Sequence, residues 1–143
     1  MPTSTLTKFE PYVENLAEAK FNFTSDATCT LTLALSNAAN APLTTYGQLS
    51  QLTTIAYTFL SARVLSVSSS SQTAGLYKLL ITSPFVLSAS GGDAAAFRYI
   101  SVYDDDSASD YLIGYWDYGS DLTLHDGESL TFTFGANGLL TIQ

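Results

Sequence analysis

The feature of this sequence that most restricts its fold is a series of short apolar runs separated by turn residues. Glycine, asparagine, aspartate and proline interrupt the chain at intervals that suit strands and exclude long helices. Short strands at this spacing favour antiparallel sheets over strand-helix-strand units. We therefore expect an all-β fold, an antiparallel β-sandwich for which a jelly roll is one arrangement. The predicted strands are residues 59–67, 76–82, 85–88, 97–103, 111–118, 129–134 and 139–142.

The N-terminal segment, residues 1–24, follows a helical period instead. Its apolar residues recur at i, i+3, i+4 and i+7, which predicts one stripe of a short helix over residues 9–20. Thr7 is a suitable N-cap, and Pro11 is tolerated in the first turn. The stripe consists of Phe9, Tyr12, Val13 and Leu16.

The period changes to two at residues 28–35, where leucines and Cys29 alternate with threonines. This pattern predicts a strand with one apolar and one solvent-facing side. Cys29 is the only cysteine, so an intramolecular disulfide is excluded, and on the apolar side we expect a buried, inert thiol. Residues 36–54 have no period and form a predicted long surface loop, from which Tyr46 and Leu49 are candidates to reach a neighbouring protein.

Length and charge limit the classes of function. The chain has 143 residues, which suits a single domain over residues 1–143. Its formal charge of -8 leaves no basic footprint for nucleic acid, and no apolar run is long enough for a membrane span or a signal peptide. We expect neither nucleic acid nor a membrane as a partner.

The residues that could carry chemistry form no specific catalytic pattern. His125 is the only histidine and lies beside a predicted Asp-Gly turn, and no GxSxG motif presents a serine. Asp117 and Glu128 could be imagined as a glycosidase pair, but their spacing is not specific to one. Residues 104–110 contain four aspartates, which could attract Ca²⁺ but lack the EF-hand glycine and glutamate, so a solvated acidic loop is favoured. We expect a protein that is not an enzyme and has no cofactor or bound metal.

The densest aromatic sequence lies at residues 111–118. Strict alternation would place Tyr111, Ile113 and Tyr115 on one face of a strand. It would place Leu112, Trp116 and Tyr118 on the other. A strand that is apolar on both faces is either covered twice, here by the long loop, or presents one face to a partner. The candidate interface residues are Tyr46, Leu49, Tyr111, Tyr115, Trp116 and Tyr118, and a carbohydrate-stacking platform is a further alternative.

Several segments together resemble a family of small structural proteins of tailed bacteriophages and prophages. The similarity follows the same order over nearly the whole chain, departs from the family at residues 44–66, and is strongest at residues 90–92, 97–99 and 112–119. The remaining segments are Lys8–Glu10, Val13–Ala17, Leu31–Leu35, Ser71–Lys78, Leu122–Leu124, Asp126–Glu128, Phe132 and Asn137–Leu139.

The resemblance implies a virion component without catalytic residues. We expect a capsid cement or decoration protein that is made in the host cytoplasm and lies on the capsid surface. Its expected partners are the major capsid protein and copies of itself in a dimer or trimer. The alternative is a tail- or fibre-associated module that recognises host carbohydrate.

Overall fold

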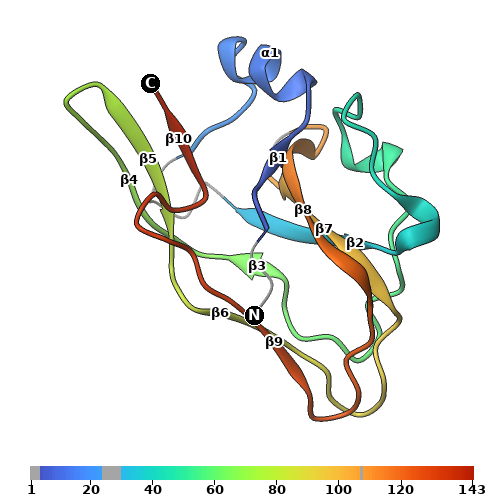
Figure 1. The fold of residues 1–143 in the computed structure, drawn as a ribbon. Coiled ribbons are helices and arrows are strands. Elements are labelled where there is room, and N and C mark those ends of the chain that lie inside the picture. Colours follow the sequence, from blue (N-terminus) through green and yellow to red (C-terminus); the bar gives the residue numbers. More distant parts are fainter. Residues whose placement is uncertain (1–3, 24–29, 107) are drawn as a thin grey trace.

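The computed structural model describes residues 4–23, 30–106 and 108–143, which form an antiparallel β fold with one short α-helix (Figure 1). This confirms the predicted all-β class with a short helix. The helix is α1 (Pro11–Ala17), and two 3₁₀ turns are η1 (Ala38–Asn40) and η2 (Leu49–Gln51). The strands are β1 (Thr7–Lys8), β2 (Leu31–Ser36), β3 (Val64–Leu65), β4 (Val67–Thr73), β5 (Leu76–Ile81), β6 (Phe85–Ser88), β7 (Phe97–Asp104), β8 (Tyr111–Leu122), β9 (Ser129–Phe132) and β10 (Leu140–Ile142).

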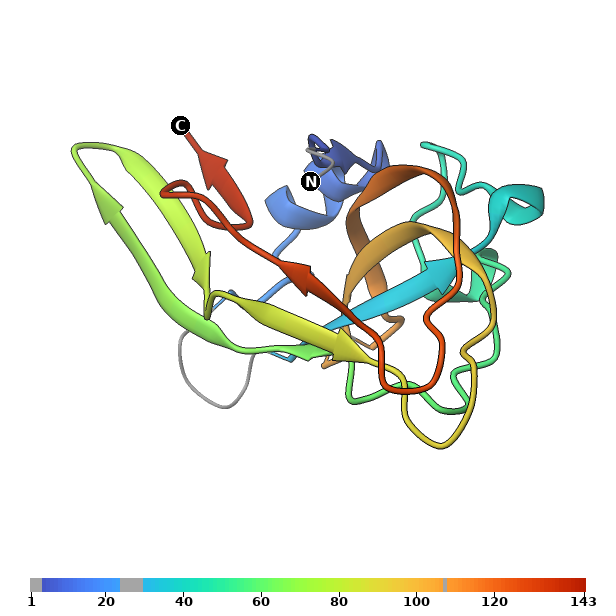
Figure 2. The ribbon, with the colours of Figure 1, turned by 60° about the horizontal axis from the view of Figure 1, so that its bottom comes forward.

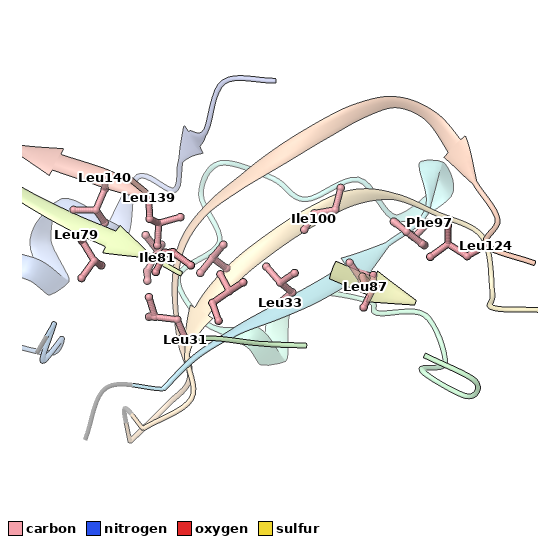
Figure 3. Packing of buried hydrophobic residues seen from close by; sticks show 14 of the residues in the cluster. Leu31, Leu33, Leu79, Ile81, Leu87, Phe97, Ile100, Leu124, Leu139 and Leu140 are labelled. Carbon is pink, nitrogen blue, oxygen red and sulfur yellow. The ribbon is translucent and has the colours of Figure 1, made fainter. Parts of the chain in front are cut away.

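The described strands form three sheets that enclose one main core. The largest has the order β1-β8-β7-β2-β3, and the smaller ones have the orders β10-β5-β4 and β6-β9. Leucines of β2 pack against apolar residues of β5, β6 and β10, as Figure 3 shows. The arrangement is therefore sandwich-like. Its second layer is divided between two small sheets, so the described strands do not form the eight-stranded double sheet of a jelly roll.

The sheet β10-β5-β4 extends beyond the rest of the molecule. Figure 2 shows the β4–β5 hairpin projecting away from the large sheet, with β10 beside it. The turn is formed by Ala74 and Gly75, which both have positive φ angles, 51° and 84°. Two such residues suit a tight hairpin turn, which the sequence pattern had not predicted at this position.

The N-terminal helix is shorter than expected. Thr7, the predicted N-cap, lies in β1 opposite Tyr115, because the edge of β8 offers it backbone hydrogen bonds; Glu10 is the cap residue. Phe9 is fully buried, whereas Val13 is 61% exposed, so the predicted stripe of four residues is not one buried face. Tyr12 does lie in the main core, and burial raises the pKa of its hydroxyl to about 12.

Strand β2 is buried on both faces, which corrects the expectation of one solvent-facing side. Leu31, Leu33 and Leu35 are 0% exposed, and Thr32 and Ala34 on the opposite face are also buried. The second face is covered because the chain after β2 folds back over it. Cys29 lies outside the described residues, so its predicted burial stays a prediction.

Residues 59–73 correct two further expectations. The predicted strand at 59–67 is mostly irregular, with Val64–Leu65 in β3 and Val67 as the first residue of β4, and the serines at 68–71 belong to β4 instead of a turn. Their backbone pairs with β5, from Ser69 opposite Leu80 to Thr73 opposite Leu76. Sheet pairing outweighs the weak strand preference of serine here because the small side chains lie at an edge of the sheet.

A turn forms near the predicted Asn137-Gly138 position, but its central residues are Ala136 and Asn137, because the Gly138 N–H donates to the Gly135 carbonyl at 2.9 Å, and it closes no hairpin. Strand β9 before it pairs with β6, while β10 after it pairs with β5. The predicted type I′ turn requires positive φ angles at both Asn137 and Gly138, and only Gly138 has one, 65°. A bend between two sheets therefore replaces the expected hairpin.

Candidate functional site

The long segment between β2 and β3 covers one face of the large sheet. Tyr46 and Leu49 pack there with Leu52 against a small core cluster made of Phe9, Ala34, Tyr103 and Leu112. Tyr115 packs on the same cluster, and its ring centroid lies 5.3 Å from that of Phe9. The structure thus places the proposed interface residues Tyr46, Leu49 and Tyr115 together in an intramolecular contact. For these residues, the arrangement corresponds to the alternative in which the long loop over residues 36–54 covers one apolar face of the aromatic strand.

A β-bulge changes which side chains of β8 share a face. Leu112 pairs with Tyr103 and Gly114 pairs with Val102, so Ile113 is an extra residue in β8. Leu112 and Tyr115 therefore share one face, and Ile113 and Trp116 lie on the other. The predicted strict alternation over residues 111–118 is wrong, because a period of two cannot reveal an inserted residue. Tyr111 lies against the Phe21 ring, with a centroid distance of 6.1 Å.

The face of the large sheet that bears Trp116 is partly uncovered, and an open groove of about 460 Å³ lies there between β8 and β9. This volume is within the range of binding sites for small ligands. The groove brings together Trp116 and Tyr118 with Phe132 and Phe134, and the Trp116 and Phe134 ring centroids are 6.1 Å apart. Its remaining lining residues are Ser4, Ile100, Asp117, Leu130, Thr131 and Thr133. We call this site the β8–β9 groove.

Two of the predicted site residues, Trp116 and Tyr118, lie in the groove, but the residues of its second wall were missed. Leu130, Phe132 and Phe134 lie at alternate positions in the predicted strand 129–134, which is a signal for a common face. The sequence cannot show that this strand lies across from β8, because β9 pairs with β6 and has no ladder to β8.

An ion pair lies at the groove wall. The Arg98 guanidinium donates to both carboxylate oxygens of Asp117, with distances of 2.7 and 2.9 Å. These bonds hold the pKa of Asp117 below its ordinary value, and they raise the pKa of Arg98. The carboxylate also accepts the backbone N–H of Gly119 at 2.8 Å. Three hydrogen bonds therefore orient the Asp117 carboxylate, and the ion pair favours its ionised form.

His125 joins two turns at another end of the molecule. Its Nδ1 lies 2.9 Å from Asp93 Oδ2, and its backbone N–H donates to Glu128 Oε2 at 2.9 Å. The contact with Asp93 raises the pKa of His125 and lowers that of Asp93. Asp93 also accepts the backbone N–H of Asp126. Both Glu128 and His125 thus stabilise these turns, and the β8–β9 groove is lined by Asp117 but not by Glu128.

The acidic turn between β7 and β8 organises its own backbone. Asp104 accepts the backbone N–H of Asp106 at 3.1 Å, and Asp105 accepts a hydrogen bond from the Thr32 hydroxyl at 3.4 Å. Burial, followed by the neighbouring charge of Asp105, raises the pKa of Asp110. Among the described residues, no group of three or more His, Cys, Asp or Glu side chains is placed to hold a metal ion.

Among the described residues, no helix has the length and hydropathy needed to span a membrane. Comparison of the chain with models of protein families, with curated proteins and with solved structures gave no match.

Proposed function

We propose that this chain is a structural protein of a tailed-bacteriophage virion, a capsid cement protein that bridges neighbouring major capsid proteins. The segments that resemble phage virion proteins support it, and their strongest part, residues 112–119, forms most of β8 and one wall of the groove. The net charge of -8 would keep an outer capsid layer soluble and would not attract packaged DNA.

The observation that carries this proposal is the open edge of the projecting sheet. Strand β4 is the edge strand of the order β10-β5-β4, and within the described residues no strand pairs with its other side. Its sequence, Val67–Thr73, contains no charged residue and no proline, which are the usual features that prevent edge pairing. A register irregularity between Val67 and Ser69 interrupts the start of the strand, but Ser69–Thr73 pair regularly with β5. This regular, uncharged edge on a projecting hairpin suits a protein whose neighbours cover it after assembly.

Repetition would give such contacts their strength. A stable protein interface buries about 800 Å² per partner, and many copies on a shell make individually modest contacts collectively strong. A dimer or trimer of the chain would multiply the contacts of each unit with the major capsid protein.

The first experiment is quantitation of virion proteins together with rebinding to particles stripped of the protein. A cement protein should be present in hundreds of copies per virion and should rebind. The variant Ser69→Lys with Ser71→Lys places two charges on the edge strand, where the two hydroxyls lie 3.4 Å apart, and should weaken rebinding. The matched control, threonine at both positions, should rebind normally. A copy number of about ten or fewer, with no rebinding of the unaltered protein, would contradict the proposal.

The β8–β9 groove favours a second candidate function. Trp116, Tyr118 and Phe132 line it beside the polar Asp117 carboxylate, a combination that suits stacking and hydrogen bonding of a sugar ring. A tail- or fibre-associated module that recognises host carbohydrate would use it. Low copy number and location at the tail by labelled-antibody electron microscopy would support this candidate over cement.

A further inference from the structure

The two walls of the β8–β9 groove are edges of different sheets. Strand β8 pairs with β1 only at Gly114 and Tyr115, so its edge beyond Tyr115 has no partner strand among the described residues. Among the described residues, β9 pairs with β6 alone. The groove thus lies between two strand edges that face a common space.

The register indicates which backbone groups of β9 face the groove. The Ala89 N–H donates to the Glu128 carbonyl, and the Phe134 N–H donates to Ser83 Oγ, so even-numbered positions face β6. Antiparallel strands alternate their hydrogen-bonding direction, so Thr131 and Thr133 turn their N–H and C=O groups toward the groove. Both threonines line it.

The same reasoning applies to the part of β8 that follows the bulge. The Phe9 N–H donates to the Ile113 carbonyl and Thr7 pairs with Tyr115, so from Ile113 onward the odd-numbered positions face away from β7. Asp117 is the next such position that lines the groove. The N–H of Gly119 is already bonded to the Asp117 side chain, which leaves the backbone of Asp117 to face an added chain.

The side chains between these edges suit an extended peptide. The rings of Trp116, Tyr118 and Phe134 can receive apolar side chains that project at alternate positions of an added strand. The edge of β8 already pairs with one short strand of the chain, β1. Ser4, in the segment that leads into β1, lies at the groove.

Charge selects the kind of peptide. Nine of the 13 acidic residues lie between Asp93 and Glu128, where Arg98 is the only lysine or arginine, and Asp117 neutralises it. The only charged residue that lines the groove is Asp117, which Arg98 neutralises, so the charge that acts on an incoming segment is the net charge of -8 of the whole chain. At this groove, net charge therefore disfavours a second copy of the chain, which also carries -8, and favours a segment with Lys or Arg beside its apolar residues; a dimer or trimer would form through another surface.

We propose that the β8–β9 groove accepts an extended segment of the major capsid protein, rich in apolar residues and carrying Lys or Arg, as an added strand that joins β8 to β9. This inference rests on the proposed cement function and names a second contact site for it, besides the edge of β4. The added strand would connect the large sheet with the β6-β9 sheet by backbone hydrogen bonds.

Amide hydrogen exchange of the free protein, measured by NMR, tests whether the groove is open. The amides of Leu130 and Phe132 face β6 and should exchange slowly, whereas those of Thr131 and Thr133 should exchange rapidly. Protection of Thr131 and Thr133 in the free protein would mean that the N-terminal residues or a second copy already occupy the groove, which would overturn the proposal.

Rebinding to particles stripped of the protein tests the occupant. Thr131→Pro removes an outward N–H and should weaken rebinding about tenfold or more, whereas Thr131→Val keeps the N–H and should not. Thr133→Arg should weaken rebinding by charge repulsion, and Thr133→Glu should preserve it. Circular dichroism and the exchange of Leu130 and Phe132 establish that each variant is folded.

The outcomes separate this inference from the proposed function. If the unaltered protein does not rebind, the cement function itself fails. If it rebinds and Thr131→Pro and Thr133→Arg rebind equally well, cement binding stands and the strand-acceptor proposal is overturned. It is also overturned if these variants change only self-association in ultracentrifugation, or only binding to host-envelope polysaccharide.

Discussion

Arg98 on β7 holds Asp117 on β8 by two parallel hydrogen bonds across the ladder, at 2.7 and 2.9 Å, on the wall of the β8–β9 groove. Such a two-point contact fixes the orientation of the carboxylate as well as its charge. Because the strands are neighbours in the largest sheet, the pair also fixes the position of the groove wall relative to β7.

Arg98→Met should raise the pKa of Asp117 toward its ordinary value, because the main cause of the lowered pKa is removed. A lowered pKa contributes stability above the unfolded-state value of about 3.9 that is lost as pH falls through the folded value. The variant should therefore show a weaker dependence of stability on pH below about pH 4. Carboxyl NMR titration and urea unfolding between pH 2.5 and 6 measure both effects. Arg98→Lys, which lacks the planar fork, should restore them only in part.

Asp93→Asn should lower the pKa of His125, because the hydrogen bond to Asp93 is the first cause of its raised value. A raised histidine pKa contributes stability that is complete below about pH 6.5 and is lost as pH rises through the folded value. The unaltered protein should thus lose a small part of its stability from about pH 6.5 upward, and Asp93→Asn should lose less. NMR titration of the imidazole and thermal unfolding at pH 5.5 and 8.5 check this; an unchanged His125 pKa in the variant would contradict it.

Phe9→Ala should destabilise the fold by about 3–5 kcal/mol, because it leaves a cavity beside Tyr103, Leu112 and Tyr115. The control, Val13→Ala, removes a side chain that is 61% exposed and should change the free energy of unfolding by no more than about 0.5 kcal/mol. Urea unfolding measures both. Equal losses of unfolding free energy in the two variants would contradict this difference in burial and would agree with the predicted helical stripe, in which both residues share one buried face.

The contrast between Phe9 and Val13 illustrates what the sequence could predict. Local periodicity correctly indicated strands at β5, β6 and β7, because apolar and polar residues alternate or cluster within one element. It failed where a partner element decides the outcome, since β1 forms only because β8 presents an edge to Thr7 and Lys8. The serines of β4 are strand for the same reason, through their ladder with β5.

The sequence predicted residues of only one of the two walls of the candidate site. Trp116 and Tyr118 are conspicuous in an aromatic run, but their partners Phe132 and Phe134 lie in a strand of another sheet. The bulge at Ile113 also changes the face on which residues after it lie, and it results from a mismatch of register with β7. Neither the pairing between sheets nor the register is encoded in a short window of sequence.

Gly138→Ala should be clearly more destabilising than Gly127→Ala. Both glycines have positive φ angles, 65° and 85°, so alanine suffers backbone strain of about 1–2 kcal/mol at either position. A Cβ at Gly138 would lie 2.3 Å from the Leu79 carbonyl oxygen, whereas a Cβ at Gly127 would meet nothing within 4 Å. The extra cost at Gly138 should separate β10 from β5, because Leu139 N–H bonds to the same carbonyl at 2.8 Å. Thermal unfolding, with amide exchange of Leu140 and Ile142, measures it; equal melting temperatures for the two variants would mean that β10 does not pack closely on β5.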